Sequence, residues 1–188
     1  MTHSSITDYH ASLLDLPIEK GVIKTDIDGW LQPTEAHFLY KCAYESANIL
    51  ELGSYHGLST SIMAQAKIDS GNTGTITTVD VFSENIEITK QNVEKIAPNV
   101  KISYNVDDAI HFVVEQNSLP MPIFYDMIFI DANHTYEWMK LLTQKVKLLS
   151  DGIMLFHDYH HRSTGVKQAV VEVLGEADKK IASIGVYE

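Results

Sequence analysis

Short, wholly apolar segments recur along the chain and constrain its fold more than any other feature. Residues 125–131 read YDMIFID and residues 152–157 read GIMLFH. A strand that is apolar on both faces must be buried on both faces, which is typical of the centre of a parallel sheet. Stretches with helical spacing of apolar residues lie between such segments. The alternation predicts an α/β fold: a doubly wound, Rossmann-like, mostly parallel sheet of six to seven strands with helices on both faces.

The expected elements follow from this alternation. We expect strands at residues 48–52, 75–81, 100–105, 125–131, 152–157 and 181–187. We expect one helix to begin at residues 33–35, and further helices to span residues 59–67, 85–96, 107–116, 136–149 and 166–174. Only one convincing strand fits after Leu174, so a sheet of six strands is expected as readily as one of seven. Residues 1–32 are expected to form an N-terminal arm or lid, and residues 33–188 a single domain.

The charge of the chain limits the classes of partner. The 188 residues carry a formal net charge of -11, and basic residues cluster only in pairs such as Lys179-Lys180. Affinity for nucleic acids depends on clustered basic residues, so we expect a small-molecule substrate, no nucleic acid and no membrane. No apolar run approaches the length of a membrane-spanning helix, and the first ten residues lack the apolar core of a signal peptide. The expected location is the cytoplasm.

A glycine-containing turn follows the first expected strand, in the sequence ELGSYHGLS at residues 51–59. In a doubly wound sheet, ligands bind beyond the carboxyl ends of the strands. Glycines allow a tight turn there, and the next helix presents free N–H groups to a ligand. Asp80 ends the following strand, where an acidic residue can accept hydrogen bonds from the hydroxyls of a ribose.

Glu51 distinguishes between two nucleotide cofactors. The dinucleotide pattern GxGxxG requires a glycine two positions before Gly53, where this chain has Glu51. A carboxylate repels a pyrophosphate but attracts the ammonium group of a methionine moiety. The turn therefore favours S-adenosylmethionine over NAD. An NAD-linked oxidoreductase remains the alternative enzyme, and a non-catalytic S-adenosylmethionine-binding module remains a third hypothesis.

Several motifs resemble those of known enzymes. ILELGSYHGLSTSIMA resembles motif I of class I S-adenosylmethionine-dependent methyltransferases, ITTVDVF the acidic motif after it, and VDDAIHF the motif beside the adenine. Together with GWLQPTEA, IDANHTYE and LFHDY, they resemble the macrocin O-methyltransferase-like family of small-molecule enzymes and, more distantly, catechol O-methyltransferases. The resemblance covers residues 29–188. It implies O-methylation of a hydroxyl on a small molecule, either a sugar or a phenolic compound.

The same resemblance implies which residues bind the cofactor. It assigns Glu51, Gly53 and Ser54 to the methionine part, Gly57 and Ser59 to the turn, Asp80 to the ribose, and Asp108 and Ala109 to the adenine. Two alternatives need no ligand. The glycines can form a plain structural turn, and Asp108 can cap the helix that follows it.

Two acidic residues end neighbouring apolar segments and suggest a metal. Asp131 ends one segment and Asp158 follows the next, so in adjacent strands they would lie about 4.8 Å apart. Carboxylates at that distance repel unless a cation or a proton lies between them. Mg²⁺ prefers such ligands, and metal-dependent relatives commonly have two adjacent acids where this chain has His157-Asp158. This departure leaves three alternatives open: an oxygen-poor site for Mg²⁺, a site tuned to another divalent cation such as Mn²⁺, or no metal site. Asp131, His157 and Asp158 are the expected ligands of any divalent cation.

His134 is the expected general base. It follows Asp131 by three residues, and this Asp-x-x-His arrangement resembles that of macrocin-type relatives. The ordinary pKa of histidine suits proton transfer at neutral pH. Asp131 and His134 are therefore the expected catalytic residues, although a loop histidine held by the backbone is the alternative. Few residues remain for a substrate cap, so a homodimer is expected to complete the substrate side.

Overall fold

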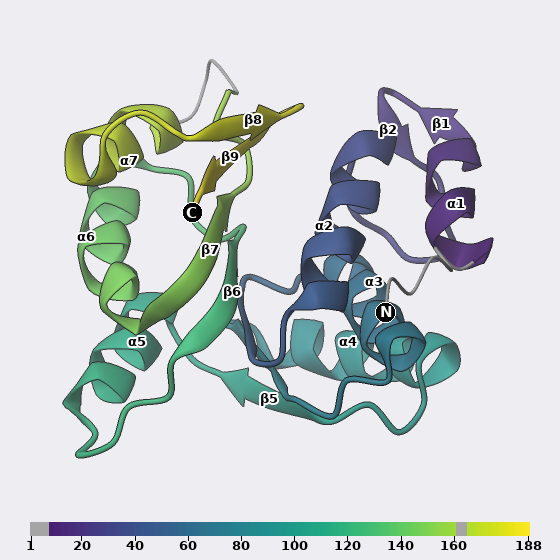
Figure 1. The fold of residues 1–188 in the computed structure, drawn as a ribbon, viewed down its shortest axis with the longest axis horizontal. Coiled ribbons are helices and arrows are strands. Elements are labelled where there is room, and N and C mark those ends of the chain that lie inside the picture. Colours follow the sequence, from purple (N-terminus) through teal and green to yellow (C-terminus); the bar gives the residue numbers. More distant parts are fainter. Residues whose placement is uncertain (1–7, 161–164) are drawn as a thin grey trace, which may run out of the picture.

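The computed structural model describes residues 8–160 and 165–188. It confirms the α/β fold, with a seven-stranded sheet in the order β5-β4-β3-β6-β7-β9-β8 (Figure 1). The strands are β3 (Ile49–Leu52), β4 (Ile76–Asp80), β5 (Ile102–Val106), β6 (Tyr125–Ile130), β7 (Ser150–Phe156), β8 (Lys179–Ile181) and β9 (Ile184–Tyr187). The five strands from β3 to β7 pair in parallel, and β9 pairs antiparallel with both β7 and β8.

Helices cover both faces of the sheet (Figure 1). One face carries α1 (Asp8–Asp15), α2 (Pro33–Glu45), α3 (Leu58–Ser70) and α4 (Ser83–Ile96), and the other carries α5 (Ala109–Ser118), α6 (Tyr136–Val146) with the short 3-10 helix η1 (Lys147–Leu149), and α7 (Val166–Leu174). Side chains along β6 alternate between the two faces. Met127 and Phe129 pack in one core and Ile128 and Ile130 in the other, so this strand is apolar throughout because both of its sides are buried.

The N-terminal arm packs against the helices rather than standing apart from them. After α1, a hairpin of β1 (Ile18–Glu19) and β2 (Val22–Ile23) turns through Lys20 and Gly21, which both have positive φ. Leu13, Ile23 and Leu31 are buried in the same core as α2 and α3. Residues 1–7 of the expected arm lie outside the described residues, and a domain boundary at residue 32 stays a prediction.

The C-terminal segment corrects one expectation. The sequence predicts a single strand at residues 181–187, but the structure divides this region into the hairpin β8–β9, which turns at Ala182 with φ 50°. The sheet therefore has seven strands and not six. β8 lies at the edge of the sheet, and Lys179 and Lys180 are exposed on it. Charged residues are common on edge strands because they discourage pairing with other chains, which is why this strand lacks an apolar signature.

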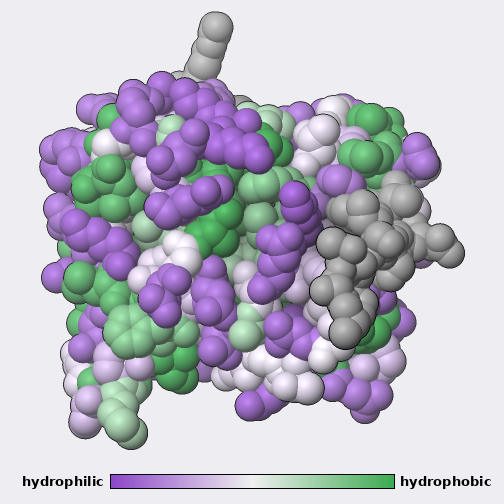
Figure 2. Space-filling view, viewed as in Figure 1, coloured by the Kyte–Doolittle hydropathy of each residue, from purple (hydrophilic) through white to green (hydrophobic). Residues whose placement is uncertain are grey.

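Within the described residues, no helix is both long enough and apolar enough to cross a membrane. On the face shown in Figure 2, hydrophilic residues cover much of the surface, and apolar residues gather between them near the centre.

Candidate active site

The turn after β3 requires glycine at two positions. Gly53 and Gly57 have φ of 97° and 84°, a conformation that other residues rarely adopt. A Cβ atom on Gly53 would lie 2.2 Å from the carbonyl oxygen of Asp131, and one on Gly57 would lie 2.8 Å from the side chain of Thr89. The two glycines therefore let the turn approach the end of β6 and the helix α4.

Glu51 lies beneath this turn and is fully buried. Its Oε1 accepts a hydrogen bond from Ser59 Oγ at 2.5 Å, and its Oε2 accepts bonds from Thr60 Oγ1 and Thr78 Oγ1 at 2.6 Å each. Burial raises the pKa of Glu51 to about 7, although the three hydroxyls oppose this shift. Glu51 thus fastens the first turn of α3 to the sheet, and its expected contact with a methionine group stays a prediction.

Asp80 connects the glycine turn to the end of β4. Its Oδ2 accepts hydrogen bonds from the backbone N–H groups of Ser54 and Tyr55, at 3.2 and 2.9 Å. Its Oδ1 accepts bonds from the N–H of Phe82 and the amide of Asn85, both at 3.0 Å. A single carboxylate therefore fixes both loops at the carboxyl ends of β3 and β4.

A cavity of about 460 Å³ opens beside these loops, and we call it the first cavity. Four of the eight expected cofactor residues line it: Gly53, Asp80, Asp108 and Ala109. The other four are not among its lining residues: Glu51, Ser54, Gly57 and Ser59. A volume of this size suits a small molecule or cofactor. Among the described residues, the buried hydroxyl of Ser54 has no hydrogen-bond partner, which leaves a polar group available next to the cavity.

Several lining residues of the first cavity carry no sequence signal of a ligand. Val81 and Phe82 are apolar and more than half exposed on its wall, beside Asn85 and Trp138. Asp108 caps α5, since its side chain accepts hydrogen bonds from the N–H groups of Ile110 and His111. The helix-cap alternative for Asp108 is therefore correct, and it leaves the residue on the cavity wall.

A second cavity, of about 600 Å³, lies on the other side of Asp131. Asp131 is the residue that lines both cavities. The rest of the second cavity is mostly polar: Lys20, Val22, Trp30, Gln32, Glu35, His134, His157, Asp158, His160, Ala182 and Ser183. Trp30 is 63% exposed, and its ring lies 5.3 Å from that of Tyr55, which lines the first cavity. An aromatic pair therefore also stands where the cavities meet.

The expected catalytic residues meet between the two cavities. Asp131 Oδ1 lies 3.2 Å from His134 Nε2 and 3.1 Å from His157 Nδ1. The other nitrogen of His134 lies 3.4 Å from Asp158 Oδ2. The ends of β6 and β7 thus bring together the four residues that the sequence predicts for catalysis and for the metal.

Glu35, in the first turn of α2, joins this cluster, although the sequence gives it no role. Its Oε2 lies 3.4 Å from His157 Nε2, and its Oε1 accepts hydrogen bonds from the N–H and hydroxyl of Ser183. Burial by itself would lower the pKa of His157, but Asp131 and Glu35 raise it to about 11. Burial would raise the pKa of both carboxylates, yet their bonds to histidine lower it. The buried His157 ring therefore lies between two carboxylates, which favour its charged form.

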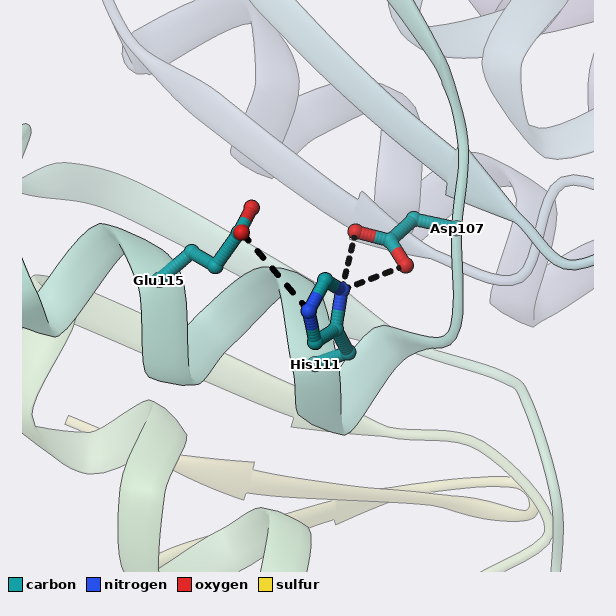
Figure 3. Close-up of side chains that lie close together, drawn as sticks. All are labelled: Asp107, His111 and Glu115. Carbon is teal, nitrogen blue, oxygen red and sulfur yellow. Dashed lines mark hydrogen bonds and ion pairs between the residues drawn. The ribbon is translucent and has the colours of Figure 1, made fainter.

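The expected metal ligands do not fit a divalent ion. In residues 8–160 and 165–188, only Asp107, His111 and Glu115 bring three candidate ligand atoms within 4.8 Å of one another (Figure 3). Asp131, His157 and Asp158 therefore do not converge as a metal site requires. The physical reason is that His157 uses both ring nitrogens on carboxylates, which leaves no lone pair for a metal.

The cluster in Figure 3 lies on the surface of α5 and of the segment just before it. His111 lies between Asp107, at 2.8 Å, and Glu115, at 3.6 Å, and its side chain is 61% exposed. The hydrogen bond to Asp107 raises the pKa of His111. Pairs spaced by four residues on an exposed helix commonly form such solvated ion pairs.

Three solved structures share this fold. An O-methyltransferase from Bacillus cereus in complex with SAH is 18% identical, with a TM-score of 0.60 over 92% of this chain and 79% of that chain. The O-methyltransferase TomG from Streptomyces achromogenes, in complex with SAM, is 18% identical, with a TM-score of 0.59 over 88% of this chain and 74% of that chain. The SAH-bound methyltransferase PaMTH1 from Podospora anserina is 18% identical, with a TM-score of 0.58 over 89% of this chain and 77% of that chain.

A family model adds evidence from the sequence itself. The comparison with curated proteins found no match. Residues 50–159, more than half of the chain, match a family model described as a methyltransferase domain. This segment includes the glycine turn, the wall of the first cavity and the ends of β6 and β7. The chain belongs to the methyltransferase domain family.

Proposed function

We propose that the protein is an S-adenosylmethionine-dependent O-methyltransferase that acts on a hydroxyl of a small molecule, a sugar or a phenolic compound. One observation carries the proposal. Asp131 lines both cavities and contacts His134, so a cofactor in the first cavity and an acceptor in the second would meet at this residue. When bound, S-adenosylmethionine supplies a methyl group on a positively charged sulfur, and the protein supplies alignment.

The charge of the first cavity favours this cofactor. Asp80, Asp107, Asp108 and Asp131 all line it. Carboxylates attract a sulfonium and an ammonium group and accept hydrogen bonds from ribose hydroxyls, but they repel the pyrophosphate of a dinucleotide. The hydroxyl of Ser54 offers one further polar contact. These features favour S-adenosylmethionine over the NAD alternative.

The residues for cofactor binding divide into two groups in this proposal. Gly53, Asp80, Asp108 and Ala109 would contact the cofactor from the cavity wall, with Ser54 beside them. Glu51 and Ser59 would act from behind, because their bond holds α3 under the turn. Gly57 would act in the same way through its contact with α4.

His134 is the proposed general base. Its side chain is partly exposed, and Asp131 can accept the hydrogen of Nε2. Nδ1 faces Asp158 at 3.4 Å, and both side chains are partly exposed, so an acceptor hydroxyl in the second cavity could take the place of Asp158. Nδ1 would then take the proton of that hydroxyl, while Asp131 holds the ring in orientation and stabilises its charged form. The pairing of His134 with Asp131 also argues against a non-catalytic binding module.

Two expectations about the surroundings stay predictions from the sequence. One is a homodimer in which a partner subunit completes the substrate side, because few residues remain for a substrate cap. The cytoplasmic location stays a prediction from the sequence.

Calorimetry of cofactor binding tests the proposal. We expect one molecule of S-adenosylmethionine or S-adenosylhomocysteine to bind per chain, and Asp80→Asn to lose most of the affinity. Asp126→Asn is a matched control, because Asp126 also accepts two backbone N–H bonds, from Ala47 and Asn48, but at the opposite end of the sheet. Saturable NADH binding with no binding of S-adenosylmethionine would favour the oxidoreductase instead.

A further inference from the structure

Negative charge gathers where the two cavities meet. Glu35, Asp131 and Asp158 all line the second cavity. Carboxylates that lie close together repel each other unless a cation or a proton lies between them. A divalent ion supplies that charge in many oxygen-rich sites. In this chain, a cation of the protein itself lies between two of the carboxylates.

That cation is the His157 side chain, which is 6% exposed. Its Nδ1 lies 3.1 Å from Asp131 Oδ1, and its Nε2 lies 3.4 Å from Glu35 Oε2. A carboxylate only accepts hydrogen bonds, so both ring nitrogens must carry a hydrogen. A histidine that binds a metal needs a lone pair on one of these nitrogens. The geometry therefore suits an imidazolium and does not suit a metal ligand.

Glu35 is held as firmly as the ring that it contacts. Its Oε1 accepts hydrogen bonds from the N–H of Ser183 at 2.8 Å and from the hydroxyl of Ser183 at 2.5 Å. Its Oε2 also accepts the N–H of Gln32 at 2.8 Å. Glu35 is only 1% exposed, and a buried carboxylate with all of its oxygens bonded has little freedom to move. Helix α2 and the β8–β9 turn thus fix the position of the His157 ring.

We propose that the imidazolium of His157 replaces a divalent ion between Asp131 and Glu35, so that this active site works without a bound metal. Glu35 and Ser183 are positioning residues, because they act on the site through the His157 ring. The inference rests on the proposed function and goes beyond it by naming the group that neutralises the site. His157 also fixes the oxygen of Asp131 that contacts His134, so the orientation of the base does not depend on a metal.

Titration with Mn²⁺, followed by the electron paramagnetic resonance signal of the free ion, tests this inference on the full chain. We expect the wild type to show no saturable binding up to about 1 mM. His157→Asp removes the cation and adds a carboxylate, so it is expected to bind one Mn²⁺ at least about tenfold more tightly. His160→Asp adds a carboxylate to the same cavity but keeps His157, so it is expected to behave like the wild type.

Two results would overturn the inference: tight binding of one Mn²⁺ to the wild type, or equal gains in the two variants. If His157→Asp does not fold, ¹⁵N NMR of histidine in the wild type decides, because a hydrogen on only one His157 ring nitrogen contradicts the inference. Calorimetry with S-adenosylmethionine on the same samples separates the two proposals. No cofactor binding, with the Mn²⁺ results as expected, would reject the proposed function and leave the internal cation in place.

Discussion

Glu35 and His157 are 122 residues apart in the sequence, yet their side chains face each other at 3.4 Å. Glu35 lies in the first turn of α2, which covers one face of the sheet, and His157 follows β7 at the carboxyl end of the sheet. Their ion pair joins the N-terminal region to the candidate active site. Because Glu35 also binds Ser183 in the β8–β9 turn, one buried carboxylate holds three distant segments together.

Glu35→Gln is expected to destabilise the protein. Removing one partner of a buried ion pair leaves the other charge without compensation, which costs about 3 to 5 kcal/mol. The free energy of unfolding, measured by urea denaturation at pH 7, checks this. Glu45→Gln is the control, because Glu45 lies exposed at the other end of the same helix and its change is expected to stay within about 0.5 kcal/mol. Equal effects of the two substitutions would contradict the ion pair.

The stability that His157 contributes should depend on pH. Because Asp131 and Glu35 raise its pKa from 6.5 to about 11, despite the opposing effect of burial, the contribution is complete below pH 6.5 and is lost as the pH rises towards 11. We therefore expect the difference in unfolding free energy between the wild type and His157→Asn to be largest near pH 6 and to shrink in the alkaline range.

His160→Asn is the control for this pH dependence. Burial, together with Lys180 and Lys167, lowers the pKa of His160, so its charge does not change in the alkaline range. Its difference from the wild type should stay constant above about pH 7. A difference for His157→Asn that is equally constant would show that the ring is neutral.

Glu51 should also make stability fall as the pH rises, but in a more acidic range than His157. Burial raises its pKa from 4.5 to about 7, so the folded state holds a proton that the unfolded state releases. Stability is therefore expected to fall as the pH rises from 4.5 to 7. Glu51→Gln keeps the shape of the side chain, and the surrounding hydroxyls can reorient to bond its amide. Urea denaturation across this range should show a flatter curve for Glu51→Gln, whereas parallel curves would mean that Glu51 is ionised throughout.

Gly53→Ala is expected to disrupt the glycine turn. A Cβ atom would lie 2.2 Å from the carbonyl oxygen of Asp131, and φ is 97°. Both β3 and the end of β6 would have to move, so we expect loss of cofactor binding together with a lower melting temperature. Gly71→Ala is the control, because Gly71 also has positive φ but has no atom within 4 Å of the added Cβ. It should cost only about 1 to 2 kcal/mol and keep cofactor affinity.

Removal of the base should separate chemistry from binding. His134→Gln is expected to lower methyl transfer by about 10² to 10⁴-fold, the usual contribution of general base catalysis. Cofactor affinity should stay unchanged, because His134 lines the second cavity and not the first. Transfer of a labelled methyl group to a panel of sugars and phenolic compounds measures the rate, and calorimetry measures the affinity. An unchanged rate would assign the base to another residue.

The sequence predicts the sheet and its ligand-binding edge because those features depend on local patterns. Uninterrupted apolar segments identify β6 and β7, and the order of parallel strands places Asp80 and Asp131 at the same edge. β8 escapes prediction because Lys179 and Lys180 lie on an exposed edge with no apolar pattern. Val81 and Phe82 escape it because nothing local distinguishes an apolar cavity wall from an apolar core.

The cluster around Asp131 exceeds what sequence patterns can predict. The ends of adjacent strands bring Asp131 and Asp158 to the same two histidines, and repulsion between carboxylates indicates a positive charge among them. The identity of that charge depends on the orientation of the His157 ring, which Glu35 sets from 122 residues away. An acidic residue in the first turn of a helix usually faces solvent or caps the helix, so the sequence gives no signal that Glu35 is buried.

A crystal structure with bound S-adenosylhomocysteine tests the central claim most directly. We expect the ligand in the first cavity, with its ribose hydroxyls at Asp80, its adenine near Asp108 and Ala109, and its sulfur on the side of Asp131 that faces His134. Density for the ligand elsewhere, or an empty first cavity at saturating ligand, would contradict the claim.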